Sequence, residues 1–501
     1  MLPNLKSVLF RSCFASASLL AGCSLLFHEA DPTSASEDAA PPAADAGPIL
    51  PWEATIEWKS ITEPYHTAGV VEEGTTIKLV GELRGEMTVA SVPSTPSGTA
   101  DLGFMSLNPS DGMPVSLERF GDVGTPTILR HRPHDGAHSV VGIFAGRESF
   151  CPTAVFAGCS VEPPGTTAGA FASQYSATPS AAQAPTSVVT LTYTTNTTSV
   201  LPDTLIQSGY AFDDRQIIVG SFKKDISVTG VNGAFEIKNT DESSKNLFMI
   251  NLGADGAVVE AVAPDLSGNQ IGWAVEPSGE ANVFVVGTYE GSLDLGLDEG
   301  ESMLPPSGGN ALFVLHANKG LSNALWARPF GTGVSGLPVY ARATGDDGLI
   351  VAGSFLDSLF LPDASVLQNP DGGESVFVLK ISQKGEIEWA KTFGTDAART
   401  RVRGLVIGSD EEIFLTGEFE GTMDLGDSTL TSTGDVDAFL IRIDALGRTR
   451  GGISLGSSSQ GSLATRLFIL EDDSVLVELI DLTEDTDSPL NIVGRTLYRV
   501  R

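Results

Sequence analysis

Three histidines lie close together in the segment RHRPHDGAH, at His131, His134 and His138. Imidazole nitrogens are common ligands of transition metals, so this cluster could bind a metal ion. Residues 135–136, an Asp-Gly pair, have the composition of a tight turn. Because extended segments are expected on both sides of that turn, the three rings need not converge. We therefore favour a structural turn over a metal site.

Cysteine supplies a second kind of chemistry. Cys151 and Cys159 are separated by seven residues in CPTAVFAGC. In an exported protein such a pair most often forms a local disulfide. Two free thiols or a redox pair are the alternative, although the CxxC spacing of redox motifs is absent. We expect a disulfide that closes a surface loop.

The segment Gly452–Gly456 satisfies the GxSxG pattern of serine hydrolases, with Ser454 at its centre. A nucleophile elbow requires a strand, a strained turn and then a helix. Here the serine lies in or at the end of a predicted strand, and no helical pattern follows. We reject this segment as a hydrolase motif.

Carboxylates form a fourth group. Acidic residues recur at the expected turns between the first two strands of each repeat, for example at residues 346–347, 410–411 and 472–473. They could form a broken ring that attracts cations or a basic partner, although Asp is also a common turn residue. Two longer segments, 294–302 and 481–488, are expected loops with enough carboxylates for Ca²⁺, but neither has EF-hand spacing. We favour solvated acidic loops.

The elements that position these residues follow from an internal repeat. Segment 401–456 is predicted to contain four short strands separated by turn signals. A glycine that ends an apolar triplet in the second strand and a phenylalanine in the third strand each recur about every 61–78 residues. The glycines are Gly81, Gly142, Gly220, Gly287, Gly353 and Gly417, and the phenylalanines are Phe104, Phe171, Phe248, Phe313, Phe377 and Phe439. A seventh, degenerate copy follows at 467–501.

The last copy lacks a fourth strand, and the missing piece precedes the first copy. Thr55, Ile56 and Trp58 lie in TIEWK, which matches EIEWA at 386–390 in the fifth copy. These patterns predict an all-β fold, a seven-bladed β-propeller with four strands per blade, over residues 51–501. The N-terminal strand is expected to complete the C-terminal blade and so close the ring. An open solenoid or tandem sandwiches are the alternative.

Segments 380–394 and 316–331, KISQKGEIEWAKTFG and HANKGLSNALWARPFG, resemble the blade repeats of bacterial quinoprotein-like and surface-protein propellers. The resemblance covers roughly residues 51–501. It implies the propeller architecture, but such blades occur in enzymes, assembly factors and adhesins alike.

Residues 1–22 have the organisation of a secretory signal, with Lys6 and Arg11 before an apolar segment. The sequence LAGC, ending at Cys23, resembles a bacterial lipobox. The resemblance implies acylation of Cys23 and cleavage before it, so that a lipid anchors the protein. An ordinary signal peptide with an incidental cysteine is the alternative. Because Ser24 is not an aspartate, the resemblance favours the outer membrane of the cell envelope.

Residues 23–50 are rich in Ala, Pro, Asp and Ser, a composition that predicts a disordered tether after the lipidated cysteine. The whole chain has 501 residues and a net charge of −33. This charge disfavours nucleic acid and anionic membrane surfaces as partners, and it favours basic partners and cations. Contact with a membrane is expected through the lipid anchor alone.

Taken together, these features predict an exported, lipid-anchored propeller that binds a protein or glycan partner or serves as an assembly scaffold. The alternative is an enzyme of the quinoprotein or glycan-cleaving type, with its site near the central channel. No pair of titratable residues can be assigned acid and base roles from the sequence, and Trp273, on a predicted innermost strand, is more often a packing residue than a stacking platform.

Overall fold

The computed structural model describes residues 54–501, with gaps at 64, 74, 97–100, 121–126, 135–136, 146–147, 150–159, 162–167, 176–186, 194–203, 265–267, 298, 301, 369–372, 396–398, 457–460 and 486–487. The described residues form strands and turns without a helix. Accordingly, no helix in this part of the chain has the length and apolar character needed to cross a membrane. The strands belong to one unit that spans Leu50–Arg501.

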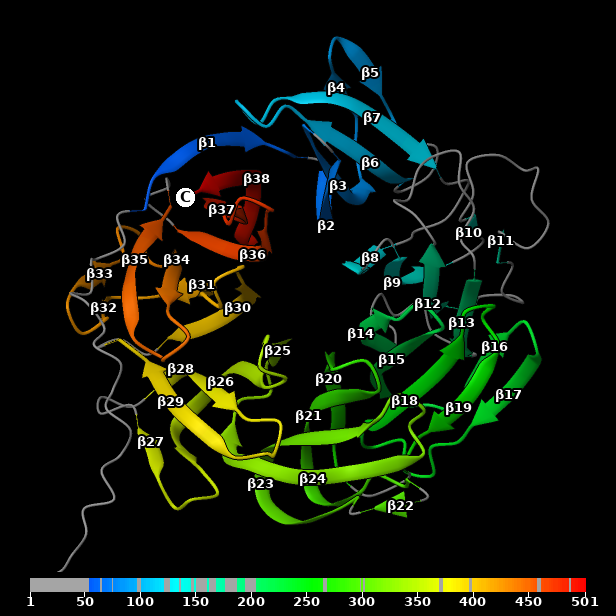
Figure 1. Ribbon diagram of the computed structural model, residues 1–501. Helices are drawn as coiled ribbons and strands as arrows, with labels where there is room; N and C mark the ends of the chain where they lie inside the picture. The colour runs from blue at the N-terminus through cyan, green and yellow to red at the C-terminus, as the bar shows by residue number, and fades with distance from the viewer. Residues whose placement is uncertain are drawn as a thin grey trace, which may run out of the picture. The chain divides into compact units, whose positions relative to one another are not determined.

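Seven antiparallel blades account for most of these strands (Figure 1). The first strand of each blade is the innermost: β2 (Tyr65–Glu73), β8 (Thr127–His134), β14 (Thr204–Ala211), β20 (Gln270–Ser278), β25 (Tyr340–Ala343), β30 (Thr400–Ile407) and β36 (Ser462–Ile469). The second strands are β3 (Thr76–Leu83), β9 (Ala137–Ala145), β15 (Arg215–Phe222), β21 (Asn282–Asp294), β26 (Leu349–Phe360), β31 (Ile413–Phe419) and β37 (Val475–Asp485).

The third strands are β6 (Asp101–Leu107), β12 (Ala168–Tyr175), β18 (Asn246–Gly253), β23 (Met303–Asn318), β28 (Glu374–Ile381), β34 (Asp437–Ile443) and β38 (Ser488–Val500). The outermost strands are β7 (Pro114–Phe120), β13 (Ser187–Tyr193), β19 (Val258–Val262), β24 (Asn323–Val334), β29 (Ile387–Phe393), β35 (Thr449–Leu455) and β1 (Ile56–Ile61). Short additional strands decorate several blades: β4 (Met87–Val89), β5 (Val92–Ser94), β10 (Glu148–Ser149), β11 (Ser160–Val161), β16 (Ile226–Gly230), β17 (Gly233–Ile237), β22 (Glu299–Gly300), β27 (Val366–Gln368), β32 (Thr422–Asp424) and β33 (Thr429–Thr431).

The blades follow one another around a ring. Each innermost strand contacts the innermost strand of the next blade, and β36 contacts β2. Buried apolar side chains gather between successive blades, and one such cluster joins Leu79 and Met105 of the first blade to Leu476 and Leu497 of the last. A single blade cannot cover both of its apolar faces, whereas stacking between two neighbours buries them. The predicted seven-bladed propeller is confirmed.

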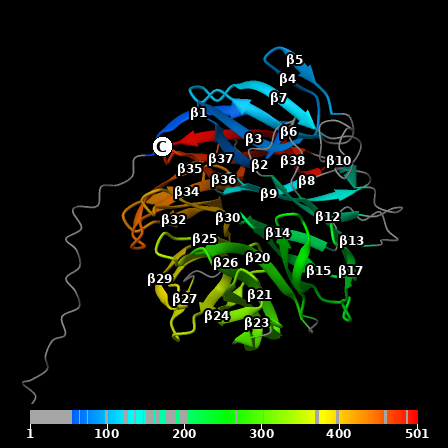
Figure 2. The same cartoon turned by 45° about the vertical axis from the view of Figure 1, so that its right-hand side comes forward.

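The N-terminal strand completes the last blade, as predicted. In β1, Ile56 lies opposite Val500 and Trp58 lies opposite Arg499, with an irregularity between them. The N–H of Thr55 donates to the carbonyl of Arg501 at 2.9 Å, and the N–H of Arg501 donates back at 3.0 Å. Figures 1 and 2 both show β1 in blue beside β38 in red. The side chain of Trp58 lies outside the described part of the structure.

The glycine and phenylalanine that mark the repeat lie opposite each other. Gly417 pairs with Phe439, and a Cβ on this glycine would lie 1.9 Å from the carbonyl oxygen of Arg401 and 2.6 Å from the Phe439 ring. The same pairing occurs between Gly220 and Phe248. The strand-two backbone therefore passes between a carbonyl and an aromatic ring, where only glycine fits.

Two blades solve this packing problem differently. In the first blade Gly81 lies opposite Gly103, and the ring of Tyr65 fills the space while its hydroxyl donates to the Gly103 carbonyl at 2.7 Å. In the last blade Leu479 lies opposite Thr496, so the large residue is on strand two and the small one on strand three. The exchange preserves volume, which explains why the seventh copy looks degenerate in the sequence.

Candidate functional site

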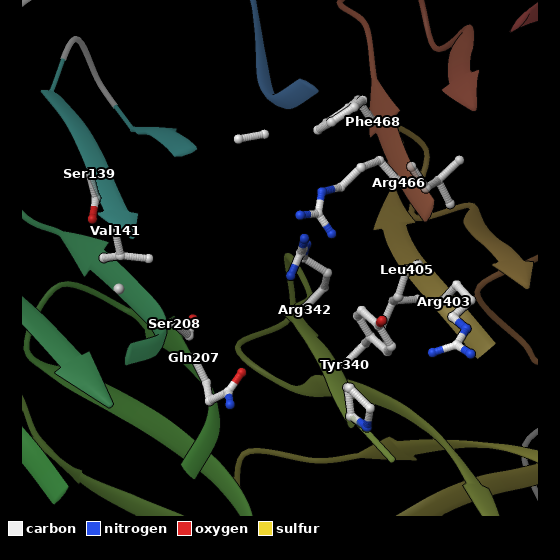
Figure 3. A pocket seen from close by; sticks show the side chains of 15 residues that line it. Ser139, Val141, Gln207, Ser208, Tyr340, Arg342, Arg403, Leu405, Arg466 and Phe468 are labelled. Carbon is white, nitrogen blue, oxygen red and sulfur yellow. The ribbon is translucent and has the colours of Figure 1, made fainter. Parts of the chain in front are cut away.

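A cavity of about 230 Å³ lies where the inner strands meet, and we call it the central cavity. Six of the seven blades supply the described residues that line it. Its wall includes Ser139, Gln207, Tyr340, Arg342, Arg403, Arg466 and Phe468 (Figure 3). These side chains combine aromatic surface with hydrogen-bond donors, and the described lining contains no carboxylate.

A β-bulge shapes several of the inner strands at the level of the cavity. The register of β14 against β15 shifts between Ile206 and Ser208, and that of β30 against β31 shifts between Val402 and Gly404. A bulge adds one residue and re-aims its side chain. The added residues are Gln207 and Arg403, and both line the cavity.

Arg403 is held by a buried ion-pair network beside the cavity. The carboxylate of Glu418, which is fully buried, accepts from Arg399 at 2.6 Å and from Arg403 at 3.0 Å. Burial alone raises the pKa of the Glu418 carboxyl, but the hydrogen bonds and charges of Arg403 and Arg399 outweigh it and keep the pKa below its usual value. Arg401 pairs with the buried Glu374 in the same region. Glu418 is therefore a carboxylate at neutral pH.

Arg342 is positioned by a second buried carboxylate. Its Nη1 lies 3.4 Å from Oε1 of Glu276, and Oε2 of Glu276 accepts the N–H of Ala343 at 3.2 Å. Glu276 comes from β20 and Arg342 from β25, so the ion pair joins two blades. In the last blade Arg466 lies opposite Glu478 on the neighbouring strand. Glu478 in turn accepts the N–H of Thr67 from the first blade at 3.2 Å.

These three arginines were not predicted from the sequence. Arg403 is the bulged residue of its strand, and Arg466 lies one position beyond the equivalent bulge. Arg342 pairs with Ile350, which places it at a third position along its strand. Because they occupy non-equivalent positions of the repeat, they produce no periodic signal. An arginine within the first strand of a blade was the available clue, and it becomes meaningful only when the strands converge.

The acidic turns are engaged in contacts between blades. The N–H of Gly345 donates to Glu411 of the next blade at 2.8 Å, and the N–H of Ser409 donates to Asp473 of the next blade at 2.8 Å. Across the ring closure, the N–H of Glu471 donates to Glu72. These carboxylates fasten neighbouring turns together, which supports their structural interpretation.

Other acids in these turns are paired with cations. A hydrogen bond from Arg215, assisted by Lys319, lowers the pKa of Asp214 to about 2. Burial acts in the opposite direction at Asp472, but hydrogen bonds from Ser474 and the nearby charge of Arg499 lower its pKa to about 2. These two carboxylates are therefore charged throughout the neutral range.

The two segments expected as acidic loops are shorter in the structure than predicted. β37 extends to Asp485 and pairs with β38 from Ser488, so segment 481–488 is mostly a hairpin. Asp294 ends β21, and its Oδ1 accepts from Gly296 and Ser302. Within the described residues, no group of three or more His, Cys, Asp or Glu side chains is arranged to hold a metal ion.

Ser454 and Trp273, two further residues considered in the sequence, both have structural surroundings. Ser454 lies within β35, pairs with Phe439 and donates to Asp437 at 3.1 Å. This placement agrees with its rejection as a nucleophile. Trp273 is 6% exposed, and its indole N–H donates to Thr288 at 3.0 Å, so it is a packing residue.

The histidine cluster is described only in its backbone. β8 ends at His134 and β9 begins at Ala137, with Pro133 opposite His138, as a strand–turn–strand arrangement requires. The histidine side chains lie outside the described part of the structure. So do Cys23, Cys151 and Cys159, so lipidation and the disulfide remain predictions.

No protein-family model matches the chain, and no curated protein matches it. Solved structures with weak similarity include a europium-containing methanol dehydrogenase, at 9% identity and a TM-score of 0.38, with 89% of this chain and 93% of that chain covered. A protein of unknown function from Dyadobacter fermentans gives 8% identity and a TM-score of 0.37, with 89% and 98% covered. Kuenenia stuttgartiensis hydrazine synthase gives 10% identity and a TM-score of 0.31, with 62% and 88% covered. Similarities this weak carry no argument about activity, and the fold assignment rests on the strand pairing.

Proposed function

We propose that this protein is a binding module of the bacterial cell envelope, anchored by a lipid on Cys23, that takes up a glycan or another small ligand in the central cavity. The observation that carries the proposal is the composition of the cavity wall. Aromatic side chains beside convergent polar groups are typical of ligand sites, because the apolar surface supplies contact area and the polar groups fix orientation. Tyr340, Phe468 and Gln207 provide this combination.

The scaffold favours binding without rearrangement. The cavity wall is built on strands from six blades, and strands hold side chains more rigidly than loops do. The ion pairs of Arg403 and Arg342 with buried carboxylates further fix the wall. A pre-organised site loses less conformational entropy when the ligand binds.

The size of the cavity narrows the ligand class. A volume of about 230 Å³ is below the roughly 300–1,000 Å³ of pockets that bind drug-sized ligands. One sugar residue fits such a space, and a folded protein element does not. A protein partner would have to contact the outer surface of the propeller instead.

The proposal is tested with full-length protein extracted from membranes in detergent. Glycan arrays and thermal-shift screening identify ligands, and the variant Gln207→Trp fills the cavity from the bulge of β14. Val259→Trp is the matched control, because Val259 lies on the outer strand β19 and is 61% exposed. We expect Gln207→Trp to abolish binding and Val259→Trp to retain it. Equal binding by both variants would refute the cavity as the binding site.

Anchorage is tested separately. Metabolic labelling with palmitate is expected to mark the protein, and Cys23→Ala is expected to remove the label. Label that persists in the variant would exclude the lipid anchor and leave the cavity proposal unaffected.

A further inference from the structure

Two of the cavity arginines face each other. Arg342 enters from β25 and Arg466 from β36, two blades apart in the ring. Figure 3 shows their guanidinium groups pointing toward one another in the cavity, while that of Arg403 lies apart from the pair. Two groups of like charge that point toward one another repel. An anion between the two groups would convert the repulsion into two charge-assisted contacts.

The described lining of the cavity contains three arginines and no carboxylate, although the chain as a whole is strongly acidic. Arg399, Arg401 and Arg403 are balanced by Glu374, Glu418 and Glu420, the last of which lies 3.7 Å from Arg399, and none of these carboxylates is among the described lining residues. Near Arg466, the carboxylate Glu478 is also paired with Arg495, at 3.4 Å. An anion in the cavity would therefore meet guanidinium groups at the wall, while charges far from the cavity are screened by salt.

Arg466 and its neighbouring arginines affect the pKa of a histidine, His66. His66 lies in the first blade, beside Arg495, Arg84 and Arg466. Burial and, to a smaller extent, the positive charges of Arg495, Arg84 and Arg466 together lower the pKa of His66 to about 3. The imidazole therefore stays neutral at physiological pH and adds no charge to the region.

The guanidinium group is suited to an oxyanion. It presents five N–H donors in a planar fork that matches the two oxygens of a carboxylate or phosphate. An arginine that pairs with one buried carboxylate, as Arg342 does with Glu276, can therefore also contact a ligand. Tyr340 and Phe468 lie on the same wall and offer aromatic faces to the rest of the ligand.

Building on the proposed function, we infer that the ligand is an acidic molecule of about one sugar residue, whose carboxylate or phosphate lies between Arg342 and Arg466. The two arginines would contact the oxyanion from two blades, and the aromatic wall would contact the ring.

The test compares glucuronate, glucose 6-phosphate, inorganic phosphate and neutral glucose at one ionic strength, using thermal shift and calorimetry on the full-length protein. We expect glucuronate or the sugar phosphate to bind at least tenfold more tightly than glucose. The preferred member of the pair distinguishes a carboxylate from a phosphate. Tight binding of inorganic phosphate alone would show that the sugar ring contributes nothing and would overturn the aromatic part of the inference.

The central variant is Arg466→Gln, which removes the charge without leaving a large void. It is expected to weaken acid binding at least tenfold, with Arg466→Lys intermediate because lysine keeps the charge but lacks the fork. The control is Arg450→Gln, which removes one positive charge from the outer strand β35, where Arg450 pairs with Asp444 at 3.3 Å. Should Arg466→Gln fail to fold, the lysine variant carries the comparison.

Two outcomes separate this inference from the proposed function. If glucose and glucuronate bind equally and Arg466→Gln has no effect, while Gln207→Trp still abolishes binding, the cavity is a ligand site but not an anion site. If none of the acidic probes binds, the inference is overturned, and the wider glycan screen alone decides the proposed function.

Discussion

Replacing His316 by phenylalanine should reduce the acid sensitivity of the propeller. His316 lies on β23, is 3% exposed and stacks on Phe284 with ring centroids 4.5 Å apart. Neither ring nitrogen has a hydrogen-bond partner among the described residues. The side chain therefore behaves as an aromatic packing residue that carries a titratable group into the core.

The size of the expected change in stability follows from the pKa of His316. Burial lowers the pKa of His316 from 6.5 to about 4, and the negative charge of Asp347 opposes the shift only in part. Between these two values the unfolded chain binds a proton that the folded protein excludes, so stability is lost as pH falls. At about pH 4.5 the loss caused by this one residue amounts to about 2.5 kcal/mol, since each pKa unit corresponds to about 1.4 kcal/mol.

The assay is chemical unfolding of wild type and His316→Phe at pH 7 and at about pH 4.5, at constant ionic strength. The variant is expected to lose about 2.5 kcal/mol less than wild type between the two pH values. At pH 7 it should differ by less than about 1.5 kcal/mol, because no hydrogen bond is removed and the ring replacement is similar in shape. Val286→Ala, a core truncation without a titratable group in the cluster that contains Phe284, is the control for overall destabilisation. If His316→Phe and wild type lose the same stability on acidification, the histidine is not held neutral by burial and the reasoning fails.

Three further predictions concern the scaffold. Gly417→Ala should destabilise the protein by more than about 3 kcal/mol in thermal or chemical unfolding, because its Cβ would meet the carbonyl of Arg401. The control Gly308→Ala, whose Cβ would have no atom within 4 Å, should change stability by less than about 0.5 kcal/mol. Equal effects of the two variants would contradict the packing explanation. Asp473→Ala should lower the free energy of unfolding by about 1–2 kcal/mol in the same assay. Asp473→Asn should lower it less, because asparagine keeps an acceptor for the neighbouring blade and tolerates the φ of 60°. If the two variants are equally stable, the hydrogen bond from Asp473 does not hold the neighbouring blades together. Deleting residues 54–61 should lower stability by about 3 kcal/mol or more, since β38 loses its outer partner. Deleting residues 26–46 should leave the melting temperature unchanged. A melting temperature that is insensitive to both deletions would argue against closure of the ring through β1.

The blade architecture was predictable because it rests on local and repeated requirements. Most blades have a glycine where strand two passes strand one and an aromatic ring that covers it, so Gly417, Phe439 and their equivalents recur about every 61–78 residues. The closure through Thr55 and Ile56 was predictable for the same reason, since a repeat array that starts with the piece missing from its end has one simple solution. The seventh blade departs from the pattern because Leu479 and Thr496 exchange large and small residues.

The central cavity was decided by tertiary structure alone. Arg342, Arg403 and Arg466 are separated by about sixty residues each, and they occupy different levels of their strands, so no sequence pattern links them. They line one cavity because the ring brings the first strands of the blades together and, for Arg403, because a bulge adds this residue to its strand. The same distinction applies to Glu411 and Asp473. In the sequence they are turn residues, and their role in fastening neighbouring blades exists only once the blades are stacked, because hydrogen bonds act over a few ångströms and join residues that the chain itself keeps far apart.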